Sequence, residues 1–139
     1  MKKITLDDFK KLFRNHYGIK FIDGMKLMDY YFQEIEEHFV KINNLDDENE
    51  VLASIIDFND YFGDADIYLH IYASYEADEI FVLKASEIHN FIDSSTTTIL
   101  FDDPLFVDFK NNKGFFLTFE FEPDNPPAYY FLDLNDIKM

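Results

Sequence analysis

The sequence contains no cysteine, and its 4 glycines, at positions 18, 24, 63 and 114, are isolated from one another. Without cysteine the chain forms no disulfide, no thiolate metal site and no cysteine nucleophile, so its folding does not require an oxidising compartment. Isolated glycines exclude the glycine-rich loops that hold phosphates in P-loop and dinucleotide-binding proteins. Chemistry that depends on a bound nucleotide is therefore not expected.

Long apolar runs are also missing. The longest uncharged apolar stretches, such as residues 128–132, fall far short of the ~20 residues that a transmembrane helix needs. Lys2 and Lys3 make the start of the chain basic, but Asp7 and Asp8 interrupt the apolar stretch that a cleaved signal peptide requires. We expect a soluble, cytoplasmic protein that has no membrane as its partner.

Basic residues are scarce. The chain has 28 Asp and Glu against 12 Lys and Arg, a formal net charge of -16. Residues 42–83 contain 11 acids and no Lys or Arg, so these acids have no cation in their own segment to pair with. Such a surface repels phosphate backbones, which disfavours direct nucleic-acid binding, and a partner attracted by charge would be basic. The competing explanation is an acidic surface that only keeps the domain soluble.

Apolar and aromatic residues, in contrast, are plentiful. The chain is 47% hydrophobic and 19% aromatic, with 17 Phe and 9 Tyr, and this composition excludes disorder as a description of the whole chain. Its 139 residues fit one ordinary domain, which we expect to span residues 1–139.

Two helices are predicted in the N-terminal third. Thr5 stands where a helix cap is expected, and the apolar residues after it recur on one helical face, so we predict a helix over residues 6–16 that stops at Gly18. A longer helix, capped by Asp23, is predicted from the strongest helical period in the chain. Its apolar stripe consists of Met25, Met28, Phe32, Ile35, Phe39 and Ile42. We expect this stripe to pack on the sheet of the same domain.

Strands dominate the rest of the chain. Residues 51–56 fit either a short helix or a strand, whereas the alternation in residues 66–73 predicts a strand that pairs antiparallel with residues 80–83. Ser86 is expected to cap a short helix. Further strands are predicted at 96–101, 105–109, 115–121 and 129–134, the middle two forming a hairpin in which Gly114 supplies the positive φ. Helices followed by strands indicate an α+β domain, with N-terminal helices packed on a mostly antiparallel β-sheet.

The search for a catalytic or metal site finds no motif. His16, His38, His70 and His89 are scattered without zinc-ligand spacing. Residues 57–66 are rich in oxygen ligands, but a calcium loop starting at Asp57 would need other residues at its fifth, sixth and twelfth positions. Serines lack the Gly-x-Ser-x-Gly setting, and with so many acids a pair of carboxylates is uninformative. We expect no metal, no cofactor and no enzymatic activity, although a catalytic triad assembled from distant residues would not be visible in a sequence.

A strip of acids and tyrosines is the candidate partner-binding surface. Carboxylates bind Arg and Lys, and tyrosine supplies rigid contact area at little entropic cost. The candidate residues are Asp57, Asp60, Tyr61, Asp64, Asp66, Tyr68, Tyr72, Tyr75, Glu76 and Asp78. The alternative is that the strand face with Tyr68, His70 and Tyr72 packs beneath a helix, because a sheet in an α+β domain buries at least one face.

A small, cysteine-free chain rich in Asp, Phe, Tyr, Asn and Ile, with the acidic stretch 42–83, resembles the immunity proteins of bacterial polymorphic toxin systems, including contact-dependent growth inhibition. The likeness lies in the general character of the chain and carries no diagnostic motif or residue. It implies a protein that binds a cognate toxin domain, commonly a basic nuclease, and neutralises it by occluding the active site or substrate channel.

The first hypothesis is accordingly an acidic, non-enzymatic inhibitor, monomeric or weakly dimeric, whose partner is a cognate basic toxin domain. A DNA mimic that occupies a nucleic-acid-binding protein is the main alternative, and it would need carboxylates in rows at roughly the phosphate spacing of a duplex. A small enzyme without a recognisable motif is the third possibility, and it would have perturbed titrating groups in a cleft.

Overall fold

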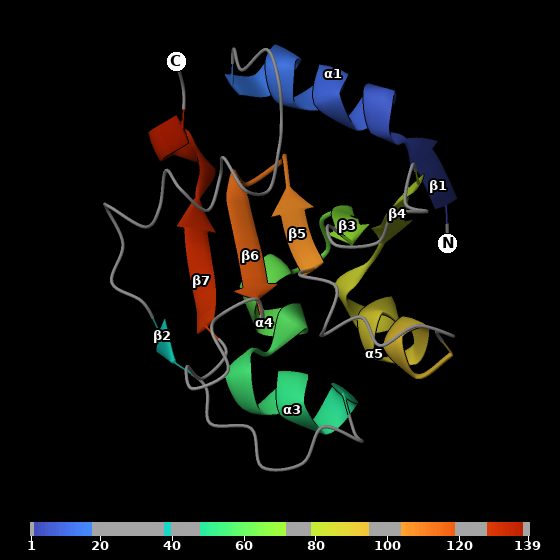
Figure 1. Cartoon of the computed structure of the whole chain (residues 1–139), viewed down its shortest axis with the longest axis vertical. Helices are drawn as coiled ribbons and strands as arrows, with labels where there is room; N and C mark the ends of the chain where they lie inside the picture. Colours follow the sequence, from blue (N-terminus) through green and yellow to red (C-terminus); the bar gives the residue numbers. More distant parts are fainter. Residues whose placement is uncertain are drawn as a thin grey trace.

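The computed structural model describes residues 2–17, 38–39, 48–71, 79–94, 104–118 and 128–137, whose helices and strands are arranged as in Figure 1. Its strands are β1 (Lys2–Thr5), β2 (His38–Phe39), β3 (Ile67–Ile71), β4 (Glu79–Leu83), β5 (Pro104–Asp108), β6 (Lys113–Thr118) and β7 (Ala128–Asp133). These form a 7-stranded sheet in the order β1-β4-β3-β5-β6-β7-β2, and every neighbouring pair is antiparallel.

Helices of the described part lie on both faces of this sheet. They are α1 (Leu6–Tyr17), α3 (Glu48–Ile55), α4 (Phe58–Phe62) and α5 (Ala85–Ser94), and a 3-10 helix, η2 (Leu134–Ile137), follows β7. In Figure 1, α1 is well separated from α3, α4 and α5, which lie close together. The expected α+β architecture, with the N-terminal helix packed on an antiparallel sheet, is confirmed.

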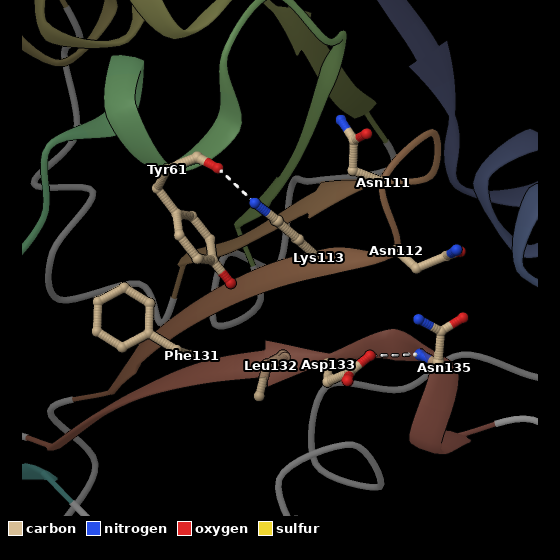
Figure 2. A pocket seen from close by; sticks show the side chains of 8 residues that line it. All are labelled: Tyr61, Asn111, Asn112, Lys113, Phe131, Leu132, Asp133 and Asn135. Carbon is tan, nitrogen blue, oxygen red and sulfur yellow. Dashed lines mark hydrogen bonds between the residues drawn. The ribbon is translucent and has the colours of Figure 1, made fainter.

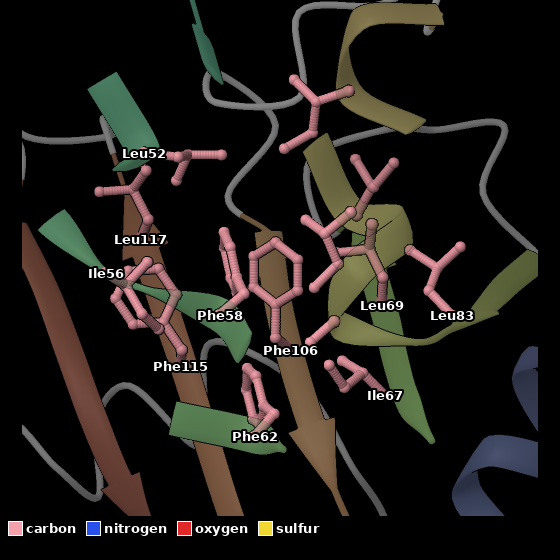
Figure 3. Close-up of a cluster of buried hydrophobic side chains, with 14 residues drawn as sticks. Leu52, Ile56, Phe58, Phe62, Ile67, Leu69, Leu83, Phe106, Phe115 and Leu117 are labelled. Carbon is pink, nitrogen blue, oxygen red and sulfur yellow. The ribbon is translucent and has the colours of Figure 1, made fainter. Parts of the chain in front are cut away.

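Strand alternation divides the buried side chains into two clusters. Leu105 and Val107 of β5 join the cluster beneath α1, whereas Phe106 between them joins the cluster beneath α3, α4 and α5. Figure 3 shows this second cluster, in which Phe58 and Phe62 of α4 approach Phe106 from the helical side. Because both faces of the sheet are covered, every residue of β5 is buried, and so is every residue of β3 except Tyr68, which is half-buried.

The N-terminal helix begins as predicted. The Thr5 Oγ1 atom accepts a hydrogen bond from the backbone N–H of Asp8 at 3.1 Å, which satisfies one of the amides at the helix start. Phe9, Phe13 and Tyr17, spaced one turn apart, are buried on the face that meets the sheet. Their contacts with Phe109 fix α1 over the end of β5.

The prediction of a long helix through residue 42 is wrong at residues 38–39, which form β2 and pair with Tyr129 and Ala128 of β7. Pairing with a strand that lies far along the chain overrides the local helical period there. The remainder of that helix, and its apolar stripe at Met25, Met28, Phe32, Ile35 and Ile42, lie outside the described residues, as does the strand predicted at 96–101.

Several local predictions are resolved or corrected. The segment that fitted either a helix or a strand is helical, as α3. Ser86 does not cap α5, because the helix already begins at Ala85, and the Glu87 carboxylate instead accepts from the backbone N–H of Lys84 at 2.9 Å. In the predicted hairpin of β5 and β6 the positive φ belongs to Asn112, at 56°, and not to Gly114, which is already part of β6.

Gly114 has a different reason to be glycine. A Cβ atom there would lie 3.2 Å from the side chain of Leu132 and 3.3 Å from the carbonyl oxygen of Phe106. The absence of a side chain therefore lets β6 pack closely between β5 and β7 at this level.

Candidate functional site

The short helix α4 presents the acidic segment to solvent. Phe58 and Phe62, four residues apart, are buried against the sheet, with the Phe58 ring 5.0 Å from that of Phe106. The carboxylate of Asp57 caps the helix by accepting from the backbone N–H of Asp60 at 3.1 Å. At the other end Gly63 adopts a φ of 64°, a conformation that glycine takes without strain. With one side fixed on the sheet, α4 leaves Asp60 exposed.

The predicted acids of this segment are exposed, but they do not all lack a cation. Asp57, Asp60, Asp64 and Asp66 all have exposed side chains. Lys84 directly follows β4. Its Nζ atom forms an ion pair with Asp66 at 2.9 Å and donates to the backbone carbonyl of Asp64 at 2.7 Å. The hydrogen bond that the Lys84 ammonium donates to the Asp66 carboxylate is the main reason that the pKa of Lys84 is raised. Folding therefore gives Asp66 a cationic partner, while Asp60 and Asp64 form no ion pair with any described residue.

Tyr61 docks on the β5–β6 hairpin. Its hydroxyl donates to the carbonyl of Gly114 at 2.9 Å, and its own carbonyl accepts from the Lys113 Nζ atom at 3.1 Å. The same Lys113 ammonium lies 5.1 Å from the centre of the Tyr61 ring, within the range of a cation–π contact. Phe131 of β7 meets the ring edge-to-face at 5.1 Å.

A hollow of about 340 Å³ opens beside Tyr61. Its lining consists of Tyr61, Asn111, Asn112, Lys113, Phe131, Leu132, Asp133 and Asn135. Figure 2 shows an aromatic end at Tyr61 and Phe131 and an amide end at the three asparagines, with Lys113 and Asp133 between the two ends. Elements that are distant in sequence therefore meet here, namely α4, the β5–β6 turn, β7 and η2.

The amide end is held by a buried carboxylate. Asp108 is 0% exposed, and its Oδ1 atom accepts from the backbone N–H groups of Lys110 and Asn111, at 2.9 and 3.1 Å. Its Oδ2 atom accepts from the side-chain amide of Asn111 at 2.8 Å. The turn is then tied to η2 by a hydrogen bond of 2.9 Å from the Leu134 N–H to the Asn112 carbonyl. The Asp133 carboxylate accepts from the Asn135 N–H at 3.0 Å.

Phe131 gives the hollow an exposed apolar wall. It has 37% of its surface exposed, more than any other large apolar side chain in the described part of the chain. Its inner side rests on Phe115 at 5.3 Å, so the ring is fixed from below and open from above. A rigid, partly exposed aromatic ring beside carboxylates is a typical anchor in protein interfaces.

The remaining predicted residues divide into two groups. Tyr68 is half-buried on the face beneath α1, where its ring stacks on Phe9 at 6.3 Å and meets Phe109 at 5.0 Å. His70, two residues along, is 6% exposed on the same face. For Tyr68 and His70, therefore, the alternative given above holds: this face of the strand packs beneath a helix. Tyr72, Tyr75, Glu76 and Asp78 lie outside the described residues.

Alkaline pH is expected to destabilise the protein through Tyr61. Burial, aided by the charges of Asp133 and Asp108, raises the pKa of Tyr61 from 10.0 to about 12. The folded state then retains a proton that the unfolded chain releases, so the stabilisation is fully present below pH 10 and is lost as pH rises through about 12. The free energy of unfolding, measured by denaturant titration, should fall by about 1–2 kcal/mol over this interval because of this group.

The Tyr61→Phe variant is the control for that pH dependence. It lacks the ionisable hydroxyl, so its stability should fall less steeply above pH 10, although the lost bond to Gly114 costs ~0.5–1.5 kcal/mol at neutral pH. Burial also raises the pKa of Tyr17 and Tyr68, so a residual slope remains. Equal slopes in both proteins would contradict the role of Tyr61.

The described residues contain no group of three or more His, Asp or Glu side chains that could hold a metal ion. The oxygen-rich segment 57–66 does not converge on one point, because Asp57 turns back to cap α4 and Asp66 is paired with Lys84. No helix in the described ranges is long and apolar enough to cross a bilayer.

Most of the hollow was missed by the sequence interpretation. Tyr61 was among the candidates, whereas Asn111, Lys113, Phe131, Asp133 and Asn135 were not. The hairpin signal at residues 105–121 could have brought the turn asparagines into consideration. Phe131 and Tyr130 point to opposite faces of the sheet, and no local signal shows which of these faces stays open to solvent. That depends on where the helices end.

The arrangement is suited to recognising a polar or cationic group through a carboxylate, amides and an aromatic wall. No family model matches the chain, and no curated protein and no solved structure is significantly similar to it.

Proposed function

We propose that this protein is a non-enzymatic, acidic inhibitor of the immunity type, which binds a basic toxin domain in the cytoplasm and covers its active site or substrate channel. The observation that carries the proposal is the exposure of Asp60 and Asp64 on α4 and its following turn, beside the aromatic pair of Tyr61 and Phe131. Carboxylates would steer a basic partner to this surface, and the aromatic rings would hold it there.

The proposal requires a toxin with a basic domain to be encoded by the adjacent gene, and kinetic binding measurements with that gene's product test this function. The informative variant is Asp60→Asn combined with Asp64→Asn, because Asp57 caps a helix and Asp66 is already paired with Lys84. Association at low salt should slow by roughly three- to tenfold, and the dependence of the association rate on ionic strength should weaken. Thermal stability should stay the same or rise slightly as repulsion is relieved.

A matched control removes the same charge elsewhere. Asp7 and Asp8 are exposed in the first turn of α1, which packs on the opposite face of the sheet. The variant Asp7→Asn combined with Asp8→Asn has the same net charge as the test variant, so a general charge effect would slow both equally. Equal rates for the two variants, or no association with the adjacent gene's product, would count against the proposed function.

A further inference from the structure

The hollow beside Tyr61 has a composition that selects among cationic groups. Its acceptors are the Asp133 carboxylate and the side-chain oxygens of Asn111, Asn112 and Asn135, and its apolar wall is the exposed ring of Phe131. At about 340 Å³ it lies near the lower limit of small-molecule sites, a size suited to one long side chain.

The local charge favours a cation. Asp108 and Asp133 are both close enough to act on the Tyr61 hydroxyl, whereas Lys113 is the one cation among the described residues of the lining. Lys113 is also engaged, since its ammonium donates to the Tyr61 carbonyl and lies against the Tyr61 ring. The Tyr61 ring is thus already in contact with a cation of the protein itself. The exposed ring of Phe131 is therefore the aromatic wall that an incoming cation would meet.

A guanidinium group fits these features better than an ammonium group. It is planar, stacks on aromatic rings and is weakly hydrated, so less hydration free energy is lost when it leaves water. Its five N–H donors can be shared between a carboxylate and several amide oxygens, whereas an ammonium offers three donors from one point. A carboxylate such as that of Asp133 has about four acceptor positions, so it can accept from several donors at once, among them the Asn135 N–H.

We propose that this hollow receives the side chain of an arginine that projects from the basic partner, with the guanidinium stacked on Phe131 and hydrogen-bonded to Asp133 and the neighbouring asparagine amides. The inference rests on the proposed function and extends it, because it names the residue type that the partner inserts. The nearby exposed acids Asp60 and Asp64 would steer the partner, and the hollow would confer specificity.

A titration with blocked arginine, N-acetyl-arginine amide, tests the site without the partner. Nuclear magnetic resonance of the full chain should show saturable shifts in the side-chain amide signals of Asn111, Asn112 and Asn135. N-acetyl-citrulline amide has nearly the same shape but no charge, and it should bind about five- to tenfold more weakly. Equal binding of the two probes, shifts confined to other residues, or no shifts would overturn the proposal.

Two variants with the same loss of charge locate the interaction. Asp133→Asn should weaken the binding of blocked arginine about five- to tenfold, while Asp7→Asn, an exposed position on α1 over the opposite face of the sheet, should leave it within a factor of two. Asparagine at position 133 still offers an oxygen to the Asn135 N–H, so the local fold is retained. Equal effects of the two variants would overturn the proposal, and the comparison of the two probes on the unchanged protein does not depend on either variant.

The outcomes separate this inference from the proposed function. If the adjacent gene's product binds through Asp60 and Asp64 but blocked arginine does not enter the hollow, the arginine site is wrong and the inhibitor function stands. If blocked arginine binds the hollow but no basic partner associates, the site is supported and the inhibitor function is wrong.

Discussion

Replacing Phe106 with alanine should lower the free energy of unfolding by ~3–5 kcal/mol, a large part of the roughly 5–15 kcal/mol by which an ordinary domain is stable. Phe106 is 0% exposed at the middle of the sheet, where its ring lies 5.0 Å from that of Phe58 and 5.9 Å from that of Phe115. The cavity left by the ring would be lined by side chains from β6 and α4, which are too constrained by their own pairing and caps to close it.

Phe131→Ala is the matched control, since it makes the same chemical change on a strand of the same sheet. With 37% of its surface exposed, Phe131 should lose less than half as much stability as Phe106. Denaturant midpoints measured under the same conditions decide between them. Equal losses would mean that the two residues are buried to the same extent in solution, and Phe131 would then be no interface anchor.

The difference between these two phenylalanines marks how far the sequence predicts the fold. Alternation in residues 66–73 correctly predicted a strand, in which Ile67, Leu69 and Ile71 join one buried cluster and Tyr68 packs against the other, because a period of two is a direct consequence of strand geometry. The pattern does not say which face is covered at which point. That depends on where α3 and α4 end relative to β7, a relation set by contacts between distant parts of the chain.

Helix starts were predictable where a side chain caps its own helix, as at Thr5. The same signal is present at Asp57, which is followed by Phe58 and Phe62 one turn apart and by Gly63. This oxygen-rich segment was tested only as a calcium loop, and no helix was predicted there. His38 and Phe39 are the opposite case: their place in a helical period is real in the sequence, and the edge of β7 supplies a backbone pairing that the period does not reveal.

The charge pattern predicted which segment is acidic, but it could not predict which acids stay unpaired. Lys84 follows directly after the cation-free segment, and the antiparallel pairing of β3 and β4 brings it back to Asp66. Lys113 reaches Tyr61 only because the hairpin packs beneath α4. These contacts reduce the candidate surface to Asp60, Asp64 and Tyr61 among the predicted residues that the structure describes.

Removing the buried carboxylate of Asp108 should have the second largest effect on stability. Asp108→Ala leaves the N–H groups of Lys110 and Asn111 and the Asn111 amide without their acceptor, and we expect a loss of ~2–4 kcal/mol. The loss is below the sum of three hydrogen bonds to a charged group, because the exposed turn lets water reach part of the freed donors.

Asp108→Asn separates geometry from charge. The amide oxygen can still accept from the two backbone N–H groups, while the acceptor for the Asn111 side chain is lost, so the cost should be ~1–2 kcal/mol. Asp64→Ala, an exposed acid outside the turn, should change the free energy of unfolding by less than ~0.5 kcal/mol in the same denaturant titration. If Asp108→Ala were as mild as Asp64→Ala, the carboxylate would not be holding the turn.

Asp108→Ala should also affect ligand binding in the hollow beside Tyr61. The turn that Asp108 fixes carries Asn111, Asn112 with its φ of 56°, and Lys113, so loosening it displaces the amide end while leaving Phe131 and Asp133 in place on β7. Asp108→Ala should therefore weaken the binding of blocked arginine even under conditions in which the variant is fully folded. Unchanged binding would place the guanidinium entirely on Phe131 and Asp133, with no contribution from the turn.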